Sequence, residues 1–363
     1  MSRTARVLAA AALLLLFGGA LLFLQEGGGG ARGAAAPVDL TTSTSCRACH
    51  QDVWDEWAAS WHAQAYTDPL VLAPAQSDNF RKEECLPCHA PAPVFESGLG
   101  KQRVFERVTE RELGVDCLSC HRAHDRVVGP ASAAAGAATA ACAPEPTLAL
   151  ASPALCAPCH NQHTTVDEWE ASSYAKAGVT CLDCHMQPVT RTRPDGSTRP
   201  GRSHLFPGGH DLATLQRAGT VEHAVESLPD GSRQLRVQVT NSGAGHNYPA
   251  DARHRALDLV ITLLQHDGIA VPPRDSGRGY GRERGTARRR FRNPYREETE
   301  RLTNLERYGR ENTQIIAGET LSLAVPFDPA VVASARIELI YKLTPIQLDD
   351  EGVRVHDATV PLR

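Results

Sequence analysis

The sequence predicts an α+β protein, in which a mainly helical or irregular part comes first and an antiparallel β-sandwich of the immunoglobulin type follows. Two observations separate the parts. Ten of the 11 cysteines form short pairs between Cys46 and Cys184, whereas alternating apolar and polar residues begin only after residue 215. Because such alternation is typical of half-buried strands, we expect one domain over 37–214 and a second over 215–363.

The first 36 residues have the composition of an export segment. Arg3 and Arg6 precede an uncharged apolar stretch from Val7 to Leu24, and small residues follow at 34–36. The stretch is about 18 residues long, which is the lower limit for crossing a bilayer. Two outcomes stay open: a signal peptide cleaved after Ala36, or an uncleaved anchor in the cytoplasmic membrane. Both predict a periplasmic or extracellular protein.

Five motifs in the first domain carry the chemistry. Each has two cysteines separated by two residues, and a histidine follows directly. This is the attachment motif of a c-type heme, because two thiols add to the porphyrin vinyl groups and the next imidazole binds the iron. Disulfides or zinc sites also use cysteine pairs, but neither requires that histidine. The pairs are Cys46/Cys49, Cys85/Cys88, Cys117/Cys120, Cys156/Cys159 and Cys181/Cys184, followed by His50, His89, His121, His160 and His185.

The sequence therefore predicts five covalently attached hemes c, with the first domain packed around them. Aromatic residues make up only 5% of the chain, so the porphyrin rings are expected to fill space that side chains would otherwise occupy. We expect helices over 51–66, 101–113 and 166–177, joined by proline-rich loops. Cys142 is the cysteine outside the motifs. It is interpreted as a free or buried thiol in a linker, and a disulfide to another chain is the alternative.

Ten histidines lie outside the motifs, which exceeds the five needed for a second histidine on every iron. Six of them are predicted as sixth ligands. His62 follows three tryptophans at helical spacing, and His124 and His163 stand three residues after a motif histidine, within reach of a neighbouring heme only. His204 and His210 flank two glycines, and His246 lies in a glycine-rich loop after a strand.

The second domain shows period-two alternation in several runs. They lie at 235–239, 257–263, 321–327 and 337–341, and Pro229-Asp-Gly231 supplies a turn. An arginine-rich loop is expected over 272–312, with Arg288, Arg289 and Arg290 at its centre. Either it is a solvated insertion, or it docks an acidic redox partner or heme propionates.

Three segments resemble the cytochrome c-554-like multiheme family. They are the block from Cys46 to Ala65 with its Trp-x-x-Ser-x-His pattern, the run from Glu168 to Met186 through Trp169, Ser172 and Tyr174, and Gly245-His246-Asn-Tyr-Pro249. The resemblance covers about 41–255 and implies stacked hemes with two histidine ligands each. The family's prototype has four hemes whereas this chain has five motifs, so its pattern of sixth ligands does not transfer whole.

These features favour electron transfer outside the cytoplasm over catalysis, and no catalytic residue is assigned. The alternative is a multiheme oxidoreductase acting on a small nitrogen or sulfur compound at one five-coordinate heme. The expected partners are redox proteins, either other cytochromes or a membrane oxidoreductase complex. The net charge of −4 argues against a nucleic-acid partner, which would require a basic surface.

Overall fold

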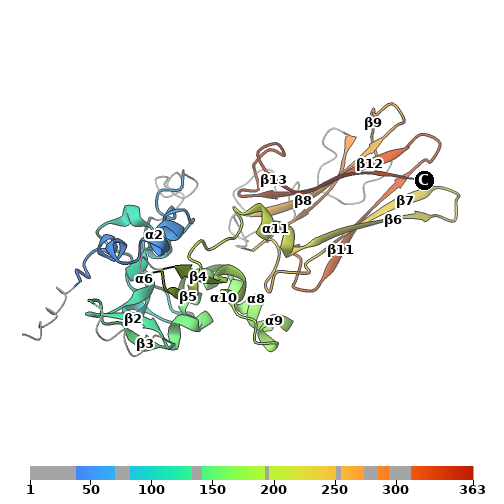
Figure 1. Cartoon of the computed structure of the whole chain (residues 1–363). Coiled ribbons are helices and arrows are strands. Elements are labelled where there is room, and N and C mark those ends of the chain that lie inside the picture. Colours follow the sequence, from blue (N-terminus) through green and yellow to red (C-terminus); the bar gives the residue numbers. More distant parts are fainter. Residues whose placement is uncertain are drawn as a thin grey trace, which may run out of the picture.

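The computed structural model describes residues 38–69, 82–132, 141–192, 196–250, 255–273, 285–293 and 312–362. The predicted export segment over 1–36 lies outside these ranges. Within them, no helix combines the length and the apolar character needed to cross a bilayer. Figure 1 shows short helices gathered in the N-terminal part and long strands in the C-terminal part, with α11 (Leu212–Ala218) beside the strands.

The N-terminal part contains short helices and turns. The α-helices are α2 (Gln51–Ala58), α4 (Lys82–His89), α5 (Val94–Ser97), α6 (Cys117–His121), α7 (Ala157–His160), α8 (Thr165–Ala171), α9 (Ser173–Lys176) and α10 (Cys181–His185). The 3₁₀ helices are η1 (Ser43–Ala48), η2 (Arg111–Leu113), η4 (Ala149–Ala151), η5 (Pro153–Leu155) and η6 (Asn161–His163). Small β elements are β1 (Arg122–Ala123), β2 (Arg126–Pro130), β3 (Glu145–Thr147) and the hairpin of β4 (Pro188–Thr192) and β5 (Thr198–Arg202).

The helices predicted from sequence are shorter than expected. The first ends at Ala58, and the third is interrupted at Ser172, whose side chain caps α9. The prediction over 101–113 is wrong except for the single turn η2. There the chain runs beside residues 90–92 instead: Ala92 N–H donates to Phe105, and Arg107 N–H donates to Ala90. Backbone pairing thus replaces the helix.

The C-terminal part consists of two antiparallel sheets. One has the order β11-β7-β6, and the other has the order β10-β8-β12-β13, with β9 paired to β8. The strands are β6 (Thr220–Ser227), β7 (Arg233–Thr240), β8 (Ala256–Leu264), β9 (Ala270–Val271), β10 (Ala287–Phe291), β11 (Thr320–Phe327), β12 (Ser334–Lys342) and β13 (Val353–Pro361). The four alternating runs seen in the sequence fall in β7, β8, β11 and β12.

Both sheets contribute to one hydrophobic core. Leu235 and Val237 of β7 lie in the same cluster as Leu257 and Leu259 of β8, and all four are fully buried. The α+β class is therefore confirmed. Two sheets around a shared core are compatible with a sandwich, while the immunoglobulin type and the domain limits at 214/215 stay predictions.

The arginine triplet does not lie in a loop. Arg288, Arg289 and Arg290 belong to β10, which pairs with β8. The side chain of Arg290 donates two hydrogen bonds to buried Asp258, at 2.6 and 2.7 Å. Arg288 also donates to Asp258, at 2.7 Å. The predicted loop over 272–312 is thus interrupted by a strand, and two of its central arginines are held by a carboxylate of the sheet.

Large buried side chains are concentrated in the C-terminal part. Among the largest fully buried side chains, Val104 alone comes from the N-terminal part. Leu118, Val166 and Leu182 are buried there, but they are smaller or not fully enclosed. This distribution matches the expectation that side chains alone do not fill the interior of the motif-bearing part.

Candidate heme sites

The third and fifth motifs begin their helices in the same way. Asp116 caps α6 and Thr180 caps α10, each through a capping box with the residue three positions later. A glycine with a left-handed backbone precedes each cap, Gly114 at φ 60° and Gly178 at φ 75°. These turns place the two cysteines and the histidine of each motif on one short helix.

The motif loops lie against one another. The thiols of Cys46 and Cys117 are in hydrogen-bonding contact, as are those of Cys88 and Cys159. Cys156 is in the same kind of contact with Cys181, so motif 1 touches motif 3, and motif 4 touches motifs 2 and 5. Among the described residues, no disulfide joins any two of the cysteines.

Two motif cysteines are more exposed than the others. Cys49 and Cys184, the second cysteines of the first and fifth motifs, are exposed, whereas the other eight motif cysteines are half-buried. The reason lies in the turns that carry them. Cys46 faces the third motif, whereas Cys49 stands where the chain leaves η1, as the residue that caps its end. Heme attachment stays a prediction for all ten motif cysteines, and at Cys49 and Cys184 it would place one edge of each of these two hemes at the surface.

Three motif histidines face a predicted sixth ligand. The ring centres of His160 and His62 are 6.2 Å apart. Those of His121 and His204 are 6.3 Å apart, and those of His185 and His246 are 6.4 Å apart. An iron between two imidazoles requires about 6.3 Å, from two metal–nitrogen bonds of about 2.0–2.1 Å and the distance from nitrogen to ring centre. The pairs therefore fit a heme iron with two axial histidines.

Hydrogen bonds orient these rings. The Nδ1 atoms of four of them lie within 3.0 Å of a backbone carbonyl oxygen. The pairs are His121 with the carbonyl of Val128, His185 with that of Pro207, His204 with that of Arg202 and His246 with that of Asn247. The second motif histidine, His89, has the same bond to Ala65 at 2.8 Å. When Nδ1 donates, Nε2 carries the free lone pair that binds a metal. The rings are thus held in the tautomer that an axial ligand needs.

Burial also keeps the candidate ligands neutral. Desolvation, together with nearby histidines, lowers the pKa of His62 to about 3. Desolvation lowers the pKa of His204 and of His246 to about 4. A histidine must be unprotonated to bind a metal, so at neutral pH these imidazoles need not release a proton first.

The other predicted ligands are placed differently. His210 stacks on Trp61 with ring centres 3.5 Å apart. His124 is exposed and has a left-handed backbone with φ 56°, and His163 ends η6 in a half-buried position. Their role as ligands, and the partners of His50 and His89, stay predictions. Of the two glycines between His204 and His210, a Cβ atom added to Gly208 would meet no atom within 4 Å, whereas one added to Gly209 would meet the ring of Tyr341.

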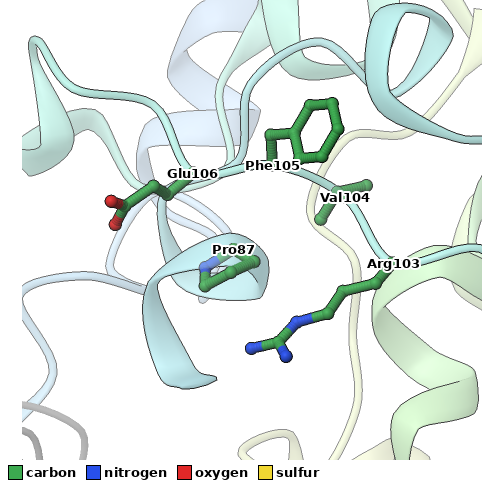
Figure 2. A pocket seen from close by; sticks show the side chains of 5 residues that line it. All are labelled: Pro87, Arg103, Val104, Phe105 and Glu106. Carbon is green, nitrogen blue, oxygen red and sulfur yellow. The ribbon is translucent and has the colours of Figure 1, made fainter. Parts of the chain in front are cut away.

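The second motif borders a hollow of about 300 Å³. Figure 2 shows Pro87, which separates the two cysteines of this motif, opposite the side chain of Arg103. Val104, Phe105 and Glu106 complete the lining. The lining is mainly apolar, and Pro87 is its contribution from the second motif.

His246 reaches its partner from the β part of the chain. The loop after β7 packs on α8 and α9, where a Cβ on Gly245 would lie 3.2 Å from Tyr174. The Tyr174 hydroxyl donates to the carbonyl of Ser242 at 3.0 Å. Asn247 N–H donates to Glu168 at 3.1 Å. The prediction that a loop of the second domain approaches a heme motif thus has a structural basis.

The structure also contains an internal repeat that the sequence analysis missed. Residues 56–60 read Glu-Trp-Ala-Ala-Ser, and residues 168–172 read Glu-Trp-Glu-Ala-Ser. Residues 114–121 and 178–185 share the pattern Gly-Val-x-Cys-Leu-x-Cys-His. The repeated segments pack alike, because the indole N–H of Trp57 donates to Val115 at 2.7 Å and that of Trp169 donates to Val179 at 2.9 Å.

Further contacts follow the repeat. Val115 N–H donates to His62 and Val179 N–H donates to Tyr174, which occupy equivalent positions. The contact between motifs 1 and 3 has its counterpart in the contact between motifs 4 and 5. Aligning the chain with itself would have revealed Glu56 and Glu168, to which the sequence analysis gave no role.

One family of known proteins resembles the segment that carries the first motifs. The family described as cytochrome c554 and c-prime matches residues 45–122. This segment contains the first three motifs and His62. Over these residues the chain is similar to the multiheme c-type cytochromes of the c554-like family.

The fold of the chain is similar to that of a solved protein. The crystal structure of a penta-heme cytochrome c552 from Thermochromatium tepidum superposes with a TM-score of 0.63 at 20% identity. The superposition covers 88% of this chain and 98% of that one. No curated protein matches the chain.

Proposed function

We propose that this cytochrome transfers electrons through five covalently bound hemes in the periplasm or outside the cell, with two histidines on each of at least three irons. The observation that carries the proposal is the set of three facing imidazole pairs, with ring centres 6.2, 6.3 and 6.4 Å apart. His160, His121 and His185 come from the motifs, and His62, His204 and His246 are their partners.

The residues around the candidate heme sites favour electron transfer over catalysis. When bound, each heme supplies a one-electron couple at its iron, whose potential depends on axial ligands and burial. At the three irons with a facing pair, two histidines would leave no position for a substrate. Backbone carbonyls hold the rings of His121, His185, His204 and His246 in one tautomer, which leaves Nε2 of each ring to bind an iron.

The contacts between motifs supply a continuous route. Motif 4 touches motif 2 through Cys159 and Cys88, and it touches motif 5 through Cys156 and Cys181. Motif 3 approaches motif 4 through Cys120, and motif 1 touches motif 3 through Cys117. Every motif therefore has a neighbour, and an electron entering at one of them has a path to the others. Redox proteins are the expected partners.

Heme counting combined with partial reduction tests this function. We expect the intact mass of the denatured protein to exceed that of the polypeptide by five hemes. With substoichiometric reductant, the electrons should spread over all hemes within the mixing time, and the air-oxidised protein should be low-spin throughout. A high-spin heme that binds and turns over hydroxylamine, nitrite or sulfite would contradict the carrier function and favour an oxidoreductase.

A further inference from the structure

Two carboxylates bind the backbone next to candidate sixth ligands. Oε2 of Glu56 accepts a hydrogen bond from the backbone N–H of His204 at 2.8 Å. Oε2 of Glu168 accepts one from the backbone N–H of Asn247, the residue after His246, at 3.1 Å. Neither residue is near its ligand in sequence, so both bonds tie distant segments together.

The two glutamates hold equivalent positions in the internal repeat. Glu56 lies on α2, which follows motif 1, and its hydrogen bond holds the ligand that faces motif 3. Glu168 lies on α8, which follows motif 4, and its hydrogen bond holds the segment of the ligand that faces motif 5. Motifs 1 and 3 are in contact, as are motifs 4 and 5. The same device therefore occurs twice in one chain.

Each glutamate is itself fixed. Nη2 of Arg191 donates to Oε2 of Glu56 at 2.6 Å and to the carbonyl of Arg202 at 2.8 Å. Arg202 is also the residue whose carbonyl binds the Nδ1 atom of His204. Oε1 of Glu168 accepts from the Thr164 hydroxyl at 3.0 Å. A fixed acceptor restricts the backbone from which the ligand ring projects.

We propose that Glu56 and Glu168 are positioning residues, which hold His204 and His246 against the irons of the third and fifth motifs. The proposal rests on the ligand pairs of the proposed function. Outer-shell partners of metal ligands change metal affinity or activity by about 10- to 100-fold when they are removed. Loss of either glutamate should therefore let its histidine leave the iron more readily, while the thioether links keep the heme attached.

Carbon monoxide binding to the reduced protein measures this release, because the gas competes with the sixth ligand. In Glu168→Ala we expect one heme to bind carbon monoxide at a concentration about 10- to 100-fold lower than in the unaltered protein. Glu168→Gln retains an oxygen acceptor for Asn247 and should restore most of the resistance. Glu170→Ala is the matched control, since Glu170 lies on the same helix but pairs with exposed Lys101 at 2.7 Å.

Glu56→Ala should have the same effect at a different heme, with exposed Asp55→Ala as its control. Unchanged carbon monoxide binding in both alanine variants would overturn the proposal. If Glu168→Ala does not accumulate, Glu168→Asp takes its place, because aspartate is shorter by one methylene and moves the acceptor away from Asn247. Carbon monoxide binding of Glu168→Asp equal to that of Glu170→Ala would then overturn the proposal. His246→Ala distinguishes failure of the positioning role from failure of the ligand assignment. If no heme of His246→Ala binds carbon monoxide more readily, the assignment of His246 as a ligand is wrong, and not only the role of Glu168.

Discussion

Individual histidines show what the sequence can and cannot specify. The motif histidines follow from spacing alone, since the residue after each cysteine pair lies next to the iron. His62, His204 and His246 were predicted as ligands from their flanking residues, and the structure brings each to a motif histidine. Their pairing was not predictable, because His62 and His160 lie almost 100 residues apart and meet through the fold of the whole N-terminal part.

Alanine variants of these three histidines test the pairs one at a time. We expect His62→Ala, His204→Ala and His246→Ala each to convert one low-spin heme to high-spin, because each iron loses an axial ligand. Electron paramagnetic resonance of the oxidised proteins counts the converted hemes. His223→Ala is the control, since His223 is exposed on β6, and its spectrum should equal that of the unaltered protein. A low-spin spectrum in all three variants would refute the pairs.

Secondary structure could be predicted well in the β part, where side chains pack into a common core, and less well in the motif-bearing part, where they do not. The strands β7, β8, β11 and β12 follow their alternation, because one face of each packs into the shared core. The helices were overestimated, since apolar residues in the motif-bearing part do not form a continuous side-chain core. The placement of Arg288 and Arg290 was missed for another reason: their partner Asp258 lies 30 residues or more away, within an apolar strand.

The buried charge cluster between β8 and β10 gives a stability prediction. Desolvation alone would raise the pKa of Asp258, but Arg290, Arg288 and Lys342 outweigh it and lower the pKa. A lowered pKa in the folded state stabilises the fold above the unfolded value of about 3.9, and this contribution is lost as the pH falls through the folded value. We expect the free energy of unfolding to be steady near neutral pH and to decline below about pH 4.

Asp258→Asn tests this cluster directly. It leaves three buried cations without their shared carboxylate and should cost about 3–5 kcal/mol at pH 7. Denaturant unfolding measures the loss, and the difference from the unaltered protein should shrink in acid. Asp357→Asn, which removes the exposed pair with Arg336, should cost about 0–1 kcal/mol. Equal losses in the two variants would contradict the assigned role of Asp258.

At the scale of the whole molecule, the β part contributes to the redox part. Its loop after β7 rests on α8 and α9 and presents His246 to His185. The internal repeat gives a reason for this arrangement. His62 and Tyr174 are equivalent positions, but His62 faces motif 4 whereas Tyr174 binds the loop of the β part. The same position therefore contacts the second copy of the repeat when it lies in the first copy, and the loop of the β part when it lies in the second copy.

The most direct test is a crystal structure with diffraction data collected on both sides of the iron absorption edge. The account predicts five anomalous peaks, three of which lie midway between the rings of His62 and His160, of His121 and His204, and of His185 and His246. A midpoint of any of these three pairs that holds no iron peak, or fewer than five peaks in all, would contradict it.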